Sequence, residues 1–149
     1  MIVVSDTSPL NYLVLIDLQH ILPQLFERIL IPEAVREELQ AAGAPEPIAQ
    51  LLAAEPKWLE TRRVSEIEPK LQHLALAISA DLVLLDERKG RQAARERGLA
   101  VSGTLGVLDL AARWRLTNMP DALRRLQRTS FRASPRLIRH ILATEKGFE

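Results

Sequence analysis

The chain has 149 residues, of which 47% are hydrophobic and 26% are charged, and these proportions are ordinary for one globular domain. No apolar run approaches the roughly 20 residues that span a bilayer, and the first apolar residues do not form a secretory signal. We therefore expect a cytoplasmic protein with no membrane partner. The absence of cysteine excludes a disulfide framework and a thiolate metal site.

The net charge of +1 conceals a division between the two halves of the chain. Residues 1–87 contain 6 Lys and Arg against 14 Asp and Glu, a balance of −8, whereas residues 88–149 contain 14 against 5, a balance of +9. Arginine, which suits bidentate phosphate contacts, makes up 16 of the 20 basic residues. The division favours a carboxylate site beside a polyanion-binding surface; a chance imbalance among solvated helix faces is the alternative.

Short apolar runs alternate with helical patterns along the chain. The expected strands are residues 2–5, 28–32, 58–63, 81–86 and 99–103. The expected helices are residues 9–25 in two pieces, 32–42, 46–54, 69–79, 88–97, 104–116, 120–128 and 134–143. The first and fourth strands are continuously apolar, as strands buried on both faces are. The alternation predicts a three-layer α/β/α fold with a parallel sheet, in one domain spanning residues 1–149 with helices 120–143 packed on it.

Four acids from distant parts of the sequence are expected at one rim of this sheet. Asp6 follows the first strand and Asp86 the fourth, while Glu38 lies on the helix after the second strand and Glu68 begins the helix before the fourth. Ligands of open parallel sheets bind outside the carboxyl ends of the strands. Asp6 and Asp86 are alternatively helix caps, and Glu68 is alternatively stabilised by its helix dipole. We expect Thr7 and Ser8 to cap the first helix, which leaves Asp6 for function.

Clustered carboxylates repel one another unless a cation lies between them. Oxygen ligands without cysteine or a histidine pair suit Mg²⁺ or Mn²⁺, and such an ion can activate water against a phosphodiester. The three histidines show no ligand spacing, and the sequence contains no P-loop, nucleophile elbow or zinc-protease motif. Only 4% of the residues are aromatic, so we expect nucleic acid to be bound through phosphate charge, with Trp58 and Trp114 in the core or an interface.

Four stretches of the chain, SDTSPL, IPEAVREEL, ADLVLLDERKGRQAARERGL and VSGTLGVLDLA, resemble the PIN domain. The similarity is closest to the PIN-like nucleic-acid-binding subgroup related to toxin–antitoxin ribonucleases. It implies a five-stranded parallel sheet and cleavage of RNA by water with Mg²⁺ or Mn²⁺. Asp6, Glu38 and Asp86 match the family acids and would hold the metal, with Thr7, Ser8 and Thr104 as supporting polar residues. The resemblance also implies a cognate antitoxin as partner, and a homodimer for which helix 49–54 is one candidate surface.

The third family acid departs from the pattern. Relatives carry G-E-x-E-A-I-x-L-A before the fourth strand, whereas this chain has Ile67 in place of the glycine and Lys70 in place of the second glutamate. Glu68 falls on the first glutamate. The departures leave open a catalytically inactive PIN-like module that binds RNA or an antitoxin. A flavodoxin-like domain that binds one Mg²⁺ is a further alternative.

Basic residues follow Asp86 directly along the chain. We expect those on helix 88–97 to contact the phosphate backbone of RNA: Arg88, Lys89, Arg91 and Arg95. A C-terminal set would extend that path or receive an acidic partner: Arg124, Arg125, Arg128, Arg132, Arg136 and Arg139.

Overall fold

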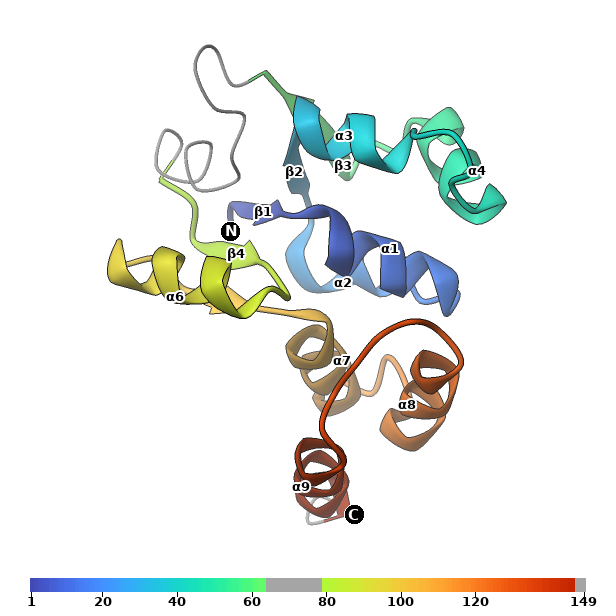
Figure 1. Ribbon diagram of the computed structural model, residues 1–149, viewed down its shortest axis with the longest axis vertical. Coiled ribbons are helices and arrows are strands. Elements are labelled where there is room, and N and C mark those ends of the chain that lie inside the picture. Colours follow the sequence, from blue (N-terminus) through green and yellow to red (C-terminus); the bar gives the residue numbers. More distant parts are fainter. Residues whose placement is uncertain (64–78, 147–149) are drawn as a thin grey trace. The chain divides into compact units, whose positions relative to one another are not determined.

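A computed structural model describes residues 1–63 and 79–146 of the chain (Figure 1). These residues form two compact units, 1–104 and 105–149, and each is described by itself. The strands are β1 (Val3–Ser5), β2 (Ile29–Pro32), β3 (Leu59–Arg62), β4 (Leu82–Leu84) and β5 (Val101–Ser102). The helices are α1 (Thr7–Leu15), α2 (Ile21–Phe26), α3 (Glu33–Leu39), α4 (Glu46–Ala54), α6 (Arg88–Glu96), α7 (Thr104–Arg113), α8 (Met119–Gln127) and α9 (Pro135–Lys146).

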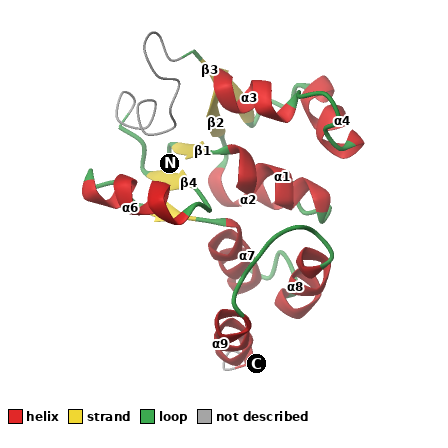
Figure 2. Ribbon diagram, in the orientation of Figure 1, coloured by secondary structure: helices red, strands yellow, loops and turns green. Residues whose placement is uncertain are grey.

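The first unit is built on a five-stranded parallel sheet with the order β3-β2-β1-β4-β5 (Figure 2). The register pairs Val4 with both Leu30 and Val83, and these three buried side chains form a core cluster. Their neighbours Val3 and Ile29 are also buried, and side chains alternate between the two faces of a strand. Both faces of the central strands are therefore covered, as their continuous apolar runs predict.

Helices connect the strands in two directions from β1. The chain moves from β1 to β2 and β3 through α1–α4, and on the other side of β1 it moves from β4 to β5 through α6. Right-handed crossovers in opposite directions place helices on opposite faces of a sheet. The predicted three-layer α/β/α fold with five parallel strands is thus confirmed. The predicted helix 69–79 falls almost entirely in residues 64–78, outside the described part of the chain.

The boundaries of the helices follow local signals. In α1 the buried side chains Leu10, Leu13 and Val14 have the spacing of a helical stripe. Gly98, with φ +77°, follows α6 in the left-handed conformation that favours glycine. Ser134 accepts a hydrogen bond from the Leu137 amide at 3.1 Å, so it caps α9 as Ser-Pro at a helix start suggests.

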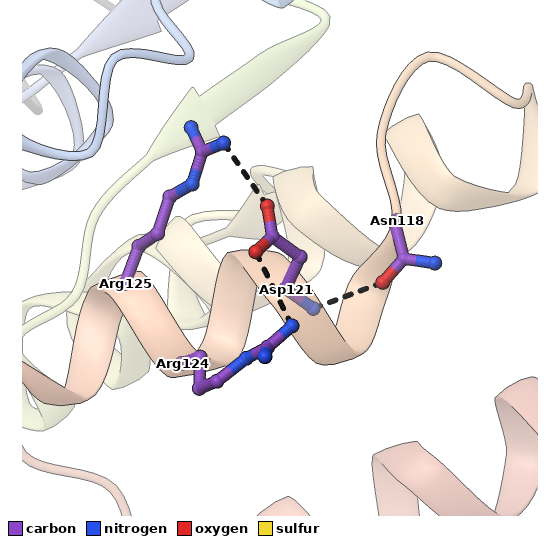
Figure 3. Close-up of polar contacts among 4 residues, drawn as sticks. All are labelled: Asn118, Asp121, Arg124 and Arg125. Carbon is purple, nitrogen blue, oxygen red and sulfur yellow. Dashed lines mark hydrogen bonds and ion pairs between the residues drawn. The ribbon is translucent and has the colours of Figure 1, made fainter.

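The second unit contains α8, α9 and α7 beyond its first residue. Asn118 caps α8 by accepting the Asp121 amide at 2.9 Å, and the Asp121 carboxylate pairs with Arg124 at 3.3 Å and Arg125 at 3.0 Å (Figure 3). Trp114, just after α7, is 70% exposed, so of the two predicted positions, core or interface, the core is excluded and an interface stays a prediction. No described helix has the length and apolar character needed to cross a membrane.

Candidate active site

The topology of the sheet creates a candidate site between β1 and β4. The connections leave these adjacent strands in opposite directions, and ligands of such sheets bind in the crevice at this switch point, outside the carboxyl ends of the strands. Asp6 directly follows β1, and its amide donates to the Leu84 carbonyl at the end of β4 at 2.9 Å. Asp86 lies two residues beyond Leu84. The backbone thus fixes two carboxylates at the same edge.

Asp6 is itself the cap of α1. Its backbone is extended (φ −80°, ψ 174°) and its Oδ1 accepts the Thr7 amide at 2.8 Å, so helix α1 begins at Thr7. The prediction that Thr7 and Ser8 cap this helix is therefore wrong, because both residues already lie inside its first turn. Capping uses one oxygen of Asp6. Its Oδ2 makes no hydrogen bond with the residues that the structure describes.

Thr7 has a different contact from the predicted one. Its Oγ1 donates to Glu38 Oε2 at 2.8 Å, which links the start of α1 to the exposed face of α3. Val35 and Leu39 are the buried residues of α3, and Glu38 flanks their stripe. The contact therefore brings the Glu38 carboxylate to Asp6, with Thr7 as the residue that orients it.

Asp86 is held by both of its oxygens. The Thr104 amide donates to Oδ1 at 2.7 Å, and the Thr104 hydroxyl donates to Oδ2 at 2.7 Å. Thr104 is fully buried, and short bonds to a carboxylate are about twice as strong as neutral ones. Gly103 completes this arrangement, because a Cβ at that position would lie only 2.6 Å from Asp86 Oδ1. The orientation of Asp86 is therefore fixed by Thr104, the first residue of α7 and the last of this unit.

The site is electrostatically unfavourable when nothing binds there. Burial is the main cause that raises the pKa of Asp6 above its ordinary value, and the negative charges of Glu38, Glu87 and Asp86 raise this pKa further. The hydrogen bond from the Thr7 amide acts in the opposite direction. A half-buried carboxylate with three acidic neighbours therefore lies at the switch point of the sheet.

A comparison with known protein families matches residues 2–146 to the PIN domain. The chain belongs to the PIN-domain family. PIN domains are generally nucleases, and an acidic rim at the carboxyl ends of parallel strands agrees with that chemistry. A search of curated proteins found no match.

Within this PIN domain, the structure places the predicted site residues unequally. Asp6, Thr7, Glu38, Asp86 and Thr104 come together at the rim through the contacts above. Ser8 makes no side-chain hydrogen bond with the described residues. Glu68, with its altered neighbours Ile67 and Lys70, lies outside the described residues.

Two further residues contribute to the rim. Glu87, which ends the fourth expected strand with Asp86 and was expected either at the rim or on ordinary surface, is near enough to raise the pKa of Asp6. Gly103 had no role predicted from the sequence, although a glycine can mark a point where another group approaches the backbone closely, as Asp86 does here. Both lie next in sequence to a predicted residue, Asp86 or Thr104.

The predicted RNA-contacting residues lie on α6, which begins two residues after Asp86. Arg88, Lys89 and Arg95 are exposed, and none of them forms an ion pair with a described residue. Arg91 is partly buried, and its Nε has no hydrogen-bond partner in the described part of the chain. Among the described residues, these side chains therefore have no acidic partner that neutralises their positive charge.

The donor chemistry of the rim suits a hard cation, because every candidate ligand is a carboxylate or hydroxyl oxygen. Within residues 1–63 and 79–146, no three His, Asp or Glu side chains are placed to hold one ion together. The fit to Mg²⁺ or Mn²⁺ is thus partial. Asp6 and Asp86 are the two carboxylates fixed by the backbone, and Glu38 is held beside them by Thr7.

Proposed function

We propose that the protein is a metal-dependent endoribonuclease that cleaves RNA phosphodiester bonds with an activated water. The observation that supports the proposal is that Glu38, Glu87 and Asp86 lie near enough to half-buried Asp6, at the switch point of a PIN domain, to raise its pKa. Such a cluster destabilises the protein unless a cation binds to it. Mg²⁺ or Mn²⁺ is the cofactor that this donor set favours.

Bound Mg²⁺ or Mn²⁺ would supply a water of lowered pKa and offset the charge that develops on the phosphate. The chain's own residues would orient and bind. Thr104 holds both oxygens of Asp86 so that its carboxylate cannot rotate, and Thr7 holds Glu38 toward Asp6. The exposed guanidinium and ammonium groups of Arg88, Lys89 and Arg95 on α6 would bind the phosphates that flank the cleaved bond.

Cleavage of a structured RNA in Mn²⁺ tests this function, with EDTA and the variant Asp6→Asn as the negative conditions. Asp81→Asn is a matched control, because Asp81 lies at the opposite end of β4 and its Oδ2 accepts the Ile2 amide at 2.6 Å, a bond that Asn retains. We expect the wild type and Asp81→Asn to cleave equally, and EDTA or Asp6→Asn to abolish cleavage. RNA binding without cleavage in any divalent metal would contradict the nuclease proposal.

Metal binding is testable without RNA. A cation that binds only the folded protein stabilises it by about 2.7 kcal/mol at a concentration one hundred times its Kd. We expect Mn²⁺ to raise the Tm of the wild type and of Asp81→Asn, and to have a smaller effect on Asp6→Asn. An equal shift in all three proteins would mean that the ion binds elsewhere.

We propose further that the nuclease is the toxin of a toxin–antitoxin pair. The balance of +9 in residues 88–149, against −8 in residues 1–87, supports an acidic protein partner as well as RNA. The product of an adjacent small reading frame should bind the protein and inhibit its cleavage of RNA. A homodimer is part of this proposal; Ala49 and Ala53 are exposed on α4, and Ala53→Arg would disrupt a dimer formed through that helix.

A catalytically inactive RNA- or antitoxin-binding module is the second candidate. The observation in its favour is that the described residues do not include three carboxylates placed around one ion. This candidate predicts RNA binding that is unaffected by EDTA and by Asp6→Asn, with no cleavage product.

A further inference from the structure

The C-terminal end of α7 presents a tryptophan to solvent. Trp114 directly follows Arg113, the last residue of α7, and its side chain is 70% exposed. Tryptophan is highly buried on average, because its ring carries a large apolar surface. Within the described part of the second unit, Leu137 is the one other large hydrophobic side chain that is exposed. Trp114 is thus the most exposed large hydrophobic side chain in the described part of this unit.

Three backbone hydrogen bonds fix the turn that carries this ring. The amides of Trp114, Arg115 and Leu116 donate to the carbonyls of Leu110, Ala112 and Ala111, at 3.1, 3.0 and 2.8 Å. The last two bonds are those of a Schellman motif, which ends a helix with one residue in the left-handed conformation. That residue is Arg115, with φ 59°, where glycine is usual. An arginine is therefore held at an unfavourable backbone position immediately beside the exposed indole.

The charges around Trp114 are positive and incompletely paired. Arg113 forms an ion pair with Asp109 at 3.2 Å, whereas Arg115 is exposed and has no ion pair with a described residue. In the same unit, the single carboxylate of Asp121 forms ion pairs with both Arg124 and Arg125 (Figure 3). Residues 105–149 contain 9 Lys and Arg against 4 Asp and Glu. Arg115 is exposed and has no acidic partner among the described residues, so its side chain can bind an external anion.

We propose that Trp114 and Arg115 form a contact site for single-stranded RNA, in which an unpaired base stacks on the indole and the guanidinium binds an adjacent phosphate. An aromatic face beside a cation is the combination that binds single strands without base specificity. A protein interface of stable size requires a wider apolar patch than one ring. The inference rests on the proposed function, because it takes RNA as the substrate. It differs from the expectation drawn from the sequence, which was that RNA is bound through phosphate charge with little base stacking.

Fluorescence makes the site observable, because the chain contains two tryptophans. In Trp58→Phe the emission comes from Trp114 alone. This variant is titrated with a single-stranded oligouridylate in EDTA, which suppresses cleavage. We expect the RNA to quench the emission, and the same RNA annealed to its complement to quench it less. Unchanged emission at RNA concentrations that saturate binding would overturn the proposal.

Affinity measurements give the second readout. Trp114→Ala should weaken single-strand binding about 5- to 150-fold, the range for one base–aromatic stack, and Trp114→Phe should retain most of the affinity. Arg115→Ala should reduce the slope of log affinity against log salt by about 0.7, the value for one phosphate of a single strand. Arg113→Ala is the matched control, because the neighbouring Arg113 guanidinium already forms an ion pair with Asp109 at 3.2 Å. Circular dichroism confirms that each variant is folded.

The outcomes separate this site from the nuclease proposal. Normal affinity of Trp114→Ala for RNA, together with a changed oligomeric state, would show that the ring binds protein and would overturn the inference. If Trp114→Ala loses affinity for RNA and the wild type does not cleave RNA with Mn²⁺, the contact site is supported. Only the nuclease proposal is then contradicted. An affinity of Trp114→Phe as low as that of Trp114→Ala would argue against stacking.

Discussion

Gly103→Ala tests whether the orientation of Asp86 depends on the absence of a side chain at residue 103. The new Cβ would lie 2.6 Å from Asp86 Oδ1 and 3.3 Å from the Leu85 carbonyl oxygen, whereas ordinary contacts begin at 3.4 Å. Oδ1 must therefore move by about 0.8 Å, the difference between 3.4 and 2.6 Å. A movement of that size lengthens or breaks the 2.7 Å bond from the Thr104 amide.

The expected cost combines two effects. Forcing a methyl group into a packed site costs about 1–3 kcal/mol, and a lost hydrogen bond to a charged group costs about 1.5–3 kcal/mol. Because relaxation relieves part of each, we expect a loss of about 2–4 kcal/mol in the free energy of unfolding. For a chain of this length that loss lowers the Tm by roughly 5–15 °C. Cleavage of RNA should fall more steeply than stability, since Asp86 loses its fixed orientation.

Gly90→Ala is the matched control for this substitution. Its Cβ would lie 2.9 Å from Leu85 Cδ2, the end of a flexible side chain, and alanine favours the helix in which residue 90 lies. Differential scanning calorimetry and a cleavage assay in Mn²⁺ compare the two variants. A Gly103→Ala protein with the stability and activity of the wild type would refute the reasoning, because Asp86 would then tolerate displacement.

Three further outcomes are expected. Because the pKa of Asp6 is raised in the folded protein, the folded state retains a proton that the unfolded state has released, and stability falls as the pH rises above the ordinary value of 3.8. Asp6→Asn, which keeps the acceptor for the Thr7 amide, should therefore have the higher Tm in EDTA at neutral pH, with the difference disappearing at acidic pH. Thr7→Val should lower cleavage roughly tenfold by releasing Glu38, whereas Thr7→Ser should restore it, as steady-state kinetics would show. Arg115→Gly should raise the free energy of unfolding in urea by about 1 kcal/mol by relieving the left-handed conformation, and Arg115→Ala should not.

The fold was predictable because local signals and the pattern of burial agree. The continuous apolar runs before Asp6 and Asp86 become the central strands β1 and β4, and Gly98 closes α6 as expected. The end of α7 was not predictable. The sequence favours a helix to residue 116, whereas the chain leaves the helix at Arg113 through a left-handed Arg115. Residues other than glycine rarely adopt the left-handed conformation of Arg115, so nothing in the sequence indicated this turn or the exposed Trp114 beside it.

The positions of candidate site residues could be predicted where a residue directly follows a strand. Asp6 and Asp86 follow strands, so parallel topology brings them to one edge regardless of side-chain detail. The contact of Thr7 with Glu38 was not predictable, because it depends on how α3 lies beside α1. The same holds for Gly103, whose role comes from the position of a carboxylate seventeen residues earlier in the chain.

Asp6 and Asp86 differ in how far their hydrogen bonds explain the presence of a charged carboxylate. Both oxygens of Asp86 accept hydrogen bonds from Thr104, so this acid contributes to stability as well as to the site. Asp6 caps α1 with one oxygen, yet burial and three neighbouring acids disfavour its charge. Asn would cap the helix equally well without that penalty. The cap explains why a polar residue is present at position 6, but it does not explain a negative charge there. The cation proposed above would explain the charge, since its binding would turn the repulsion among these carboxylates into binding energy.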